Sequence, residues 1–158
     1  MQKITPFLWF NENAEEAINF YTSIFKDSKM GKVTRNGDNG PGPKGSVMVA
    51  NFTIEGQEFI ALNGGPRFQF TEAVSFVVSC KSQDEIDYYW DKLLQGGGKE
   101  QACGWLKDQF GLSWQIVPAQ MGELMSGSDP QRSARVMQAM MKMIKLDLPT
   151  LQKAYDGA

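Results

Sequence analysis

The stretch ITPFLWF, Ile4–Phe10, followed by NENAEEAINFYTSIF, Asn11–Phe25, carries the pattern from which the fold can be predicted. A short apolar and aromatic run of this kind predicts a buried strand. Asn13 and Glu16 have the spacing of a capping box, in which two side chains bond unpaired backbone N–H groups at a helix start. The apolar residues that follow recur at helical spacing. We therefore expect a strand followed by an amphipathic helix.

The same pattern returns 69 residues later. AVSFVVSC, Ala73–Cys80, predicts a second strand, and Ser82 with Glu85 forms a second capping box. The next apolar residues again recur at helical spacing, and Gly96–Gly98 ends that helix. Because a strand, a cap and a helix face all correspond at one offset, the sequence indicates an internal duplication.

Each predicted helix is followed by three predicted strands. In the first half they are Lys29–Arg35, Ser46–Ile54 and Gln57–Asn63; in the second, Lys99–Cys103, Trp105–Lys107 and Leu112–Pro118. The fold class is therefore α+β, with two tandem β-α-β-β-β modules at about 1–66 and 70–120 forming one domain, 1–120. One helix covers one face of each sheet, so the free faces are expected to form a half-barrel cleft between the modules, the default ligand site.

Residues 121–158 are expected to form a helical extension of the same domain. Asp129-Pro130 predicts a helix start, and Asp147 to Gly157 a last short helix. The stripe between them is rich in methionine, whose flexible thioether suits adaptable contacts. The stripe could pack within the chain or across a homodimer, and we expect the protein to form a homodimer. The residues of the stripe are Val136, Met137, Met140, Met141, Met143 and Ile144.

The composition excludes several classes of function. The chain has 158 residues, a formal net charge of −2 and no histidine. Histidine-dependent triads and histidine-based metal sites are excluded, and the absence of a basic stripe argues against nucleic-acid binding. No apolar run is long enough to span a membrane. Cys80 and Cys103 are expected as small hydrophobic residues of a reduced, cytoplasmic protein.

Four segments of the chain have a familiar sequence: ITPFLWFNENAEEAINFYTSIF, EGQEFIALNGGP, CGWLKDQFGLSWQIVP and VMQAMMKMIKLDLPTLQKAY. They resemble the vicinal oxygen chelate (glyoxalase/bleomycin-resistance) superfamily, and within it the PhnB-like group, often labelled demethylubiquinone methyltransferase-like. The resemblance covers essentially the whole chain. It implies that metal ligands, where present, stand near Pro6, Ile60 or Leu62, Ser75 and Gln115. Most of these side chains cannot bind a divalent ion, so we expect neither a metal nor another cofactor. A nucleotide-type methyl donor usually needs a Gly-rich turn between a strand and a helix, and the sequence has no such turn. The methyltransferase label is therefore not supported.

The candidate ligand contacts are therefore polar or aromatic residues of the predicted cleft. Residues alternate along a strand, so Gln115 lies on the opposite face from Trp114. Trp114 and Trp9 are both expected between sheet and helix. The candidates are Gln115, Ser75, Ser79, Asn63 and Trp105.

Two functions of different class follow. The first is a metal-free module that binds a small, partly apolar or aromatic molecule. The alternative is an enzyme of the same superfamily (glyoxalase-like, dioxygenase-like, or a methyltransferase as the label says) that uses a carboxylate or tyrosine instead of histidine.

Overall fold

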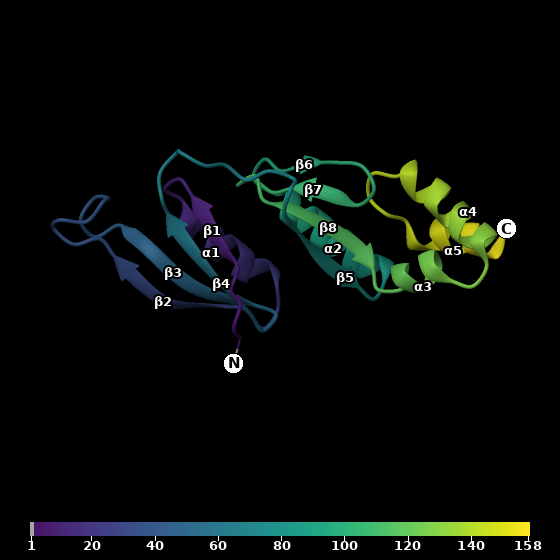
Figure 1. Cartoon of the computed structure of the whole chain (residues 1–158), viewed down its shortest axis with the longest axis horizontal. Helices are drawn as coiled ribbons and strands as arrows, with labels where there is room; N and C mark the ends of the chain where they lie inside the picture. Colours follow the sequence, from purple (N-terminus) through teal and green to yellow (C-terminus); the bar gives the residue numbers. More distant parts are fainter. Residues whose placement is uncertain (1) are drawn as a thin grey trace. The chain divides into compact units, whose positions relative to one another are not determined.

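The computed structural model describes residues 2–158. The chain divides into two compact units, the first ending at Phe70 and the second beginning at Thr71. Each unit contains one four-stranded mixed sheet, which confirms the predicted α+β class (Figure 1).

The first unit runs β1 (Phe7–Phe10), α1 (Ala14–Ile24), β2 (Lys29–Arg35), β3 (Val47–Ile54) and β4 (Gln57–Asn63). The strand order is β1-β4-β3-β2, with β1 parallel to β4 and the other pairs antiparallel. The first strand begins at Phe7, later than predicted. Pro6 has no N–H to donate to a neighbouring strand, and Ile4 is 84% exposed.

The second unit repeats this topology. It runs β5 (Ser75–Cys80), α2 (Gln83–Leu94), β6 (Lys99–Glu100), β7 (Trp105–Lys107) and β8 (Ser113–Pro118), with strand order β5-β8-β7-β6. The duplication inferred from sequence is thus matched by two sheets of identical strand order. The strand predicted over 99–103 ends at Glu100, because the chain turns between Ala102 and Trp105.

The two helix starts differ from each other. Ser82 Oγ accepts a hydrogen bond from Glu85 N–H, as predicted, while the Glu85 carboxylate accepts one from Lys81 N–H. The capping box predicted at Asn13 is wrong, because its side chain makes no capping bond and its backbone is not extended (φ −116°, ψ 29°). The side chain of Asn63, far along the chain, accepts from Ala14 N–H instead.

In β1, Leu8 and Phe10 are buried in the core that α1 covers. Trp9 therefore lies on the opposite face of the sheet, since successive strand residues alternate. The prediction that Trp9 lies between sheet and helix is wrong. Its indole N–H donates to Gly65 O (3.0 Å) and its ring meets Phe68 edge-on (centroids 4.8 Å), so Trp9 anchors the segment that leaves β4.

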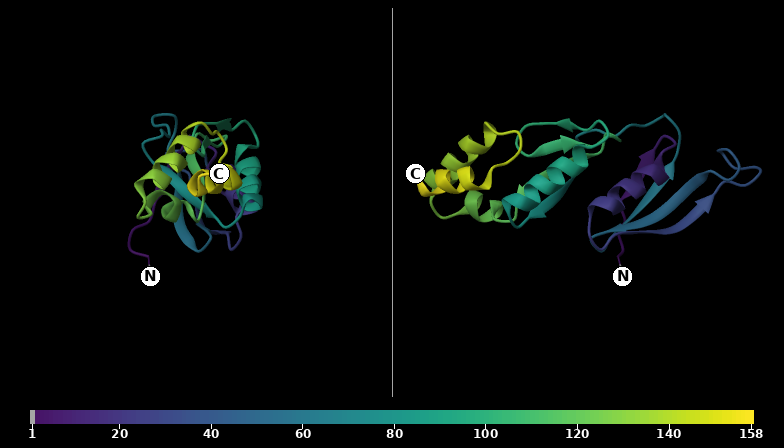
Figure 2. Two further views of the ribbon diagram at one scale, coloured as in Figure 1. Left: turned by 90° about the vertical axis from the view of Figure 1, so that its right-hand side faces the viewer. Right: turned by 180° about the vertical axis from the view of Figure 1, so that it is seen from behind.

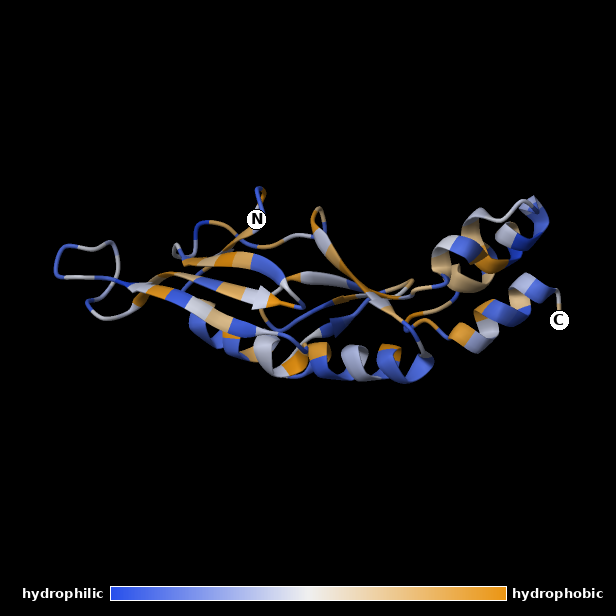
Figure 3. Cartoon of the chain, turned by 90° about the horizontal axis from the view of Figure 1, so that it is seen from below, coloured by the Kyte–Doolittle hydropathy of each residue, from blue (hydrophilic) through white to orange (hydrophobic). Residues whose placement is uncertain are grey.

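The extension forms three helices, α3 (Met121–Ser126), α4 (Pro130–Met141) and α5 (Leu148–Asp156), and the first was not predicted. Asp129 and Asp147 cap the other two as predicted. The helices lie together within the second unit (Figure 2). Their ribbons alternate hydrophobic and hydrophilic residues (Figure 3). The apolar residues pack around a small core of four buried side chains, Leu124, Val136, Leu146 and Leu151.

The predicted methionine stripe is only partly buried. Met140 and Met143 pack against this helical core. The helix ends at Met141, which is 66% exposed, and Ile144 beyond it is also exposed. The stripe thus contributes to packing within the chain, while its contact across a homodimer stays a prediction.

The segment between α4 and α5 is tied to α2. Gln83 donates to Leu146 O and accepts from Leu148 N–H, and Lys145 pairs with Asp87 at 2.7 Å. The hydrogen bond from Lys145 lowers the pKa of Asp87, and the same bond raises the pKa of Lys145. Stability from this pair is lost as the pH falls through the lowered pKa or rises through the raised one. Both side chains are more than a third exposed, so the contribution is small.

Among residues 2–158, no helix is both long enough and apolar enough to cross a bilayer.

Candidate functional site

The sheet of the second unit has one face covered by α2 and a second face, here called the open face, that is only partly covered. On the open face Val77 and Ser79 are exposed, whereas Ser113 is buried and Val117 packs against the helical core of the extension. Phe76, Trp114 and Leu106 point to the face on which α2 packs, and Trp114 and Leu106 are buried there. The prediction for Trp114 is therefore confirmed. The intervening residues of the three strands point to the other face. They are Ser75, Val77, Ser79, Ser113, Gln115, Val117, Trp105 and Lys107.

Two predicted site residues are in direct contact on this open face. Gln115 Nε2 donates to Ser75 Oγ at 3.0 Å. Val77, aligned with Gln115 across the parallel β5–β8 pair, is 58% exposed, and Ser79 is exposed beside Val117. The side-chain oxygen of Gln115, Oε1, accepts no hydrogen bond from the described residues. The face thus offers an amide of fixed orientation next to exposed apolar surface.

Trp105 is the cross-strand neighbour of Gln115 on the other side. It follows a tight turn in which Cys103 (φ 60°) and Gly104 (φ 83°) both have left-handed backbones and Trp105 N–H bonds to Ala102 O. Positive φ at both central positions is the geometry of a type I′ turn. Cys103 N–H donates to Met143 O and Gly104 N–H to Ile144 O. The extension thus holds the turn that positions Trp105.

A charged pair beside this face was missed from the sequence. Lys107 forms an ion pair with Glu72. That hydrogen bond lowers the pKa of the Glu72 carboxyl, so the group is ionised at neutral pH. Glu72 lies in the irregular segment between β4 and β5, where no periodicity marks it. Ser113, the neighbour of Lys107 in the ladder, is fully buried, and its hydroxyl has no hydrogen-bond partner among residues 2–158.

The fifth candidate, Asn63, lies in the first unit and has a structural role. Its Oδ1 accepts from Ala14 N–H at 2.8 Å and its Nδ2 donates to Val47 O at 3.0 Å. Both ends of the amide are occupied, so Asn63 joins β4, β3 and the start of α1.

The two cysteines have different environments. Cys80 is buried, as predicted, and burial raises the pKa of its thiol to about 12. Such a thiol is not a nucleophile at neutral pH. Cys103 is half-buried in the turn before Trp105.

The residues do not fit a divalent metal ion. Between residues 2 and 158, no three His, Cys, Asp or Glu side chains lie close enough to share one. At the positions implied by the superfamily, Pro6 accepts a strand bond from Ile60 N–H and Gln115 is bonded to Ser75. Neutral amide and hydroxyl oxygens without a carboxylate are a poor donor set for such an ion.

Two β-α-β-β-β units with matching strand order define a protein of the glyoxalase/bleomycin-resistance fold. The family match and the 42% identical PhnB structure described below place it in the vicinal oxygen chelate superfamily. The chain belongs to the PhnB-like family, whose model, described as 3-demethylubiquinone-9 3-methyltransferase, matches residues 2–117. The extension lies outside this match.

One solved structure is similar enough to support the family, and two more distant ones share the fold. A putative 3-demethylubiquinone-9 3-methyltransferase, PhnB protein, from Bacillus cereus is 42% identical, with a TM-score of 0.69 over 75% of this chain and 100% of that chain. Protein PA1353 from Pseudomonas aeruginosa is 22% identical (TM-score 0.61; 75% and 98% covered). The fosfomycin resistance protein FosX from Listeria monocytogenes, complexed with Mn(II) and sulfate, is 12% identical (TM-score 0.54; 77% and 93% covered). The comparison with curated proteins gave no match.

Proposed function

We propose that the open face of the β5–β8–β7 sheet binds a small, partly apolar or aromatic molecule without a metal ion. The observation that carries this proposal is the Gln115–Ser75 pair, in which Gln115 Nε2 donates to Ser75 Oγ at 3.0 Å. Gln115 lies in the sheet with Trp105 on one side and the exposed Val77 on the other. A flat ligand would stack on the indole ring and accept or donate at the amide. That this face belongs to a cleft shared with the first module stays a prediction.

The alternative is an enzyme with a carboxylate at this face. Glu72 is the carboxylate that the structure supplies there, through its pair with Lys107. Its lowered pKa makes it a weak base and leaves it without a proton to donate at neutral pH. Methyl transfer, named in the family description, has no Gly-rich strand-to-helix turn for a nucleotide-type donor, since Gly64-Gly65 follows β4 without a helix after it. The binding module is therefore the function we favour.

We expect Mn²⁺, Ni²⁺ and Zn²⁺ to leave the melting temperature unchanged, because the open face lacks a suitable donor set. A site filled at 100 times its Kd would add about 2.7 kcal/mol, which raises the Tm of a chain of this size by about 5 to 10 °C. The measurement is a thermal-shift titration of protein freshly treated with EDTA, which also serves as the baseline. A saturable, stoichiometric rise of that size would contradict the metal-free proposal.

We also propose a homodimer, supported by the exposed part of the methionine stripe, Met137, Met141 and Ile144. Burying these side chains against a second copy would remove apolar surface from water. Light scattering should give twice the 17.7 kDa of one chain at micromolar concentration. Replacing Met141 and Ile144 by serine is expected to shift the protein toward the monomer, whereas a wild-type mass of a single chain would contradict the dimer.

A further inference from the structure

The chain contains three Asn-Gly dipeptides, Asn36-Gly37, Asn39-Gly40 and Asn63-Gly64. In such a pair the glycine backbone nitrogen can attack the side-chain carbonyl carbon of the asparagine, because glycine has no side chain to hinder the approach and its backbone is permissive. The product is a deamidated residue. Sequence alone makes the three pairs equivalent, and the structure separates them.

Asn63-Gly64 is held at both reacting groups. The amide of Asn63 bonds Ala14 N–H and Val47 O, and the attacking nitrogen of Gly64 donates its hydrogen to Phe10 O at 2.8 Å. Reaction there requires that these bonds at the end of β4 open together.

Asn36 is held at its side chain. It is 8% exposed, and its Nδ2 donates to Ser46 Oγ at 2.9 Å. Gly40 and Gly42 pack so closely on this carboxamide that a Cβ at either position would lie within 3.0 Å of it. The side chain therefore has no room to turn toward Gly37 N.

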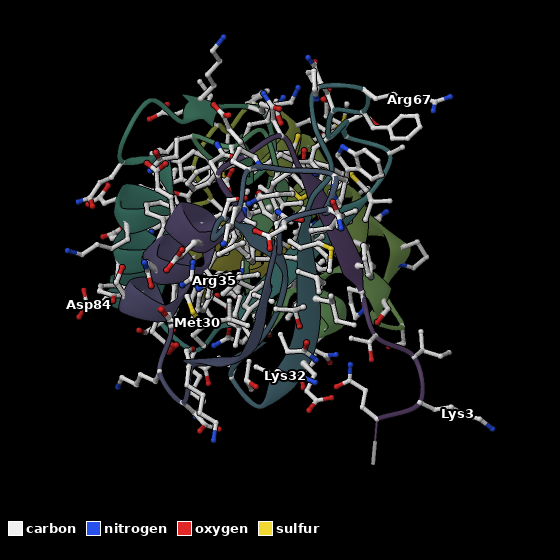
Figure 4. The ribbon with its side chains drawn as sticks, turned by 90° about the vertical axis from the view of Figure 1, so that its left-hand side faces the viewer. Lys3, Met30, Lys32, Arg35, Arg67 and Asp84 are labelled. Carbon is white, nitrogen blue, oxygen red and sulfur yellow. The ribbon has the colours of Figure 1, made fainter. Side chains whose placement is uncertain are left out.

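Asn39 lacks both restraints. It is exposed, and its side chain makes no hydrogen bond within residues 2–158. The Gly40 N–H is held only by a long contact of 3.4 Å to Gly37 O. The loop, residues 36–46, starts after Arg35 (labelled in Figure 4) and extends past the ends of β2 and β3 (Figure 1). We propose that Asn39 is the deamidation site of the folded protein.

The chemistry needs only water. Gly40 N loses its proton and forms a bond to Asn39 Cγ, the Cγ–Nδ2 bond breaks, and ammonia leaves to give a succinimide. Water then opens the ring to aspartate or isoaspartate. The new carboxylate lies one residue from Asp38, which pairs with Lys44 at 2.8 Å. Deamidation thus adds a negative charge beside an existing ion pair, and isoaspartate lengthens the backbone of the loop.

The test follows all three sites in one sample. The full-length protein is incubated at pH 8.5 and 37 °C, digested, and analysed by mass spectrometry for conversion at each asparagine; a parallel sample contains urea. In the folded protein, conversion at Asn39 should be at least about tenfold faster than at Asn36 and Asn63, since structure suppresses reactions that need local opening. In urea the three rates should converge. Equal rates in the folded protein, or slower conversion at Asn39, would overturn the proposal.

Ser46→Ala provides a matched control. It removes one hydrogen bond from Asn36, which is expected to speed conversion there by a factor of about two to ten, the equivalent of one ordinary hydrogen bond. Rates at Asn39 and Asn63 should stay unchanged. If Asn63 also accelerates, the variant is loosened as a whole, and a urea unfolding curve of Ser46→Ala beside the wild type then measures that loss of stability. No acceleration at Asn36 would contradict the protection argument.

Discussion

Replacing Asp108 by alanine is expected to lower the free energy of unfolding by about 3 kcal/mol or more, because a buried carboxylate with several donors is removed. Asp108 is only 3% exposed. Its Oδ1 accepts from Phe110 N–H and Leu112 N–H, and its Oδ2 accepts from the Trp114 indole N–H at 2.9 Å. It thereby fixes both the β7–β8 turn and the orientation of the largest side chain beneath the open face.

The measurement is urea unfolding followed by tryptophan fluorescence and circular dichroism. Asp108→Asn retains the oxygen for the two backbone donors but turns an amide N–H toward the indole N–H, so an intermediate loss is expected. Asp38→Ala is the control, since Asp38 is exposed and pairs only with Lys44; a change below about 0.5 kcal/mol is expected. An Asp108→Ala protein that unfolds at the wild-type urea concentration would show that the network adds nothing.

Replacing Leu146 by alanine is expected to cost about 2 to 5 kcal/mol, the range for removing a buried leucine side chain. Leu146 is fully buried with Leu124, Val136 and Leu151. It also touches the turn before Trp105, because a Cβ on Gly104 would lie 2.9 Å from its Cγ. Leu146 therefore fills the core of the helical extension and also packs the extension against the turn before Trp105.

Thermal unfolding and limited proteolysis would check this expectation. Proteolysis should cut residues 119–158 faster in Leu146→Ala than in the wild type, since the docked segment opens more often. Gln131→Ala is the control in α4, with an exposed side chain outside the methionine stripe and little expected effect. Wild-type melting and wild-type cleavage of Leu146→Ala would refute a role for this contact.

The fold was predictable because its pattern is local and occurs twice. Strands, helix faces and turns depend on near neighbours, so β2, β4 and β7 have the predicted bounds. The cap at Asn13 failed because the capping oxygen comes from Asn63, a contact that depends on the tertiary structure. Trp9 was misplaced for a similar reason, since an aromatic run does not show which of its residues faces the helix.

The candidate site was predictable in part. Gln115 and Ser75 were each predicted as cleft residues, but their hydrogen bond depends on the pairing of β5 with β8, which the structure supplies. The bonds that hold the turn before Trp105 to Met143 and Ile144 could not be predicted. They are backbone hydrogen bonds between residues about 40 positions apart, and no side-chain pattern marks them. Glu72 was missed because a single carboxylate in an irregular segment has no pattern.

The most direct test of metal-free ligand binding is native mass spectrometry of the freshly purified protein, wild type beside Gln115→Leu. Leucine is close in size to glutamine but cannot bond Ser75 or a polar ligand. We expect a stoichiometric small-molecule adduct on the wild type that Gln115→Leu loses, and no divalent metal on either protein. A metal ion bound one per chain, or an adduct that Gln115→Leu retains in full, would contradict it.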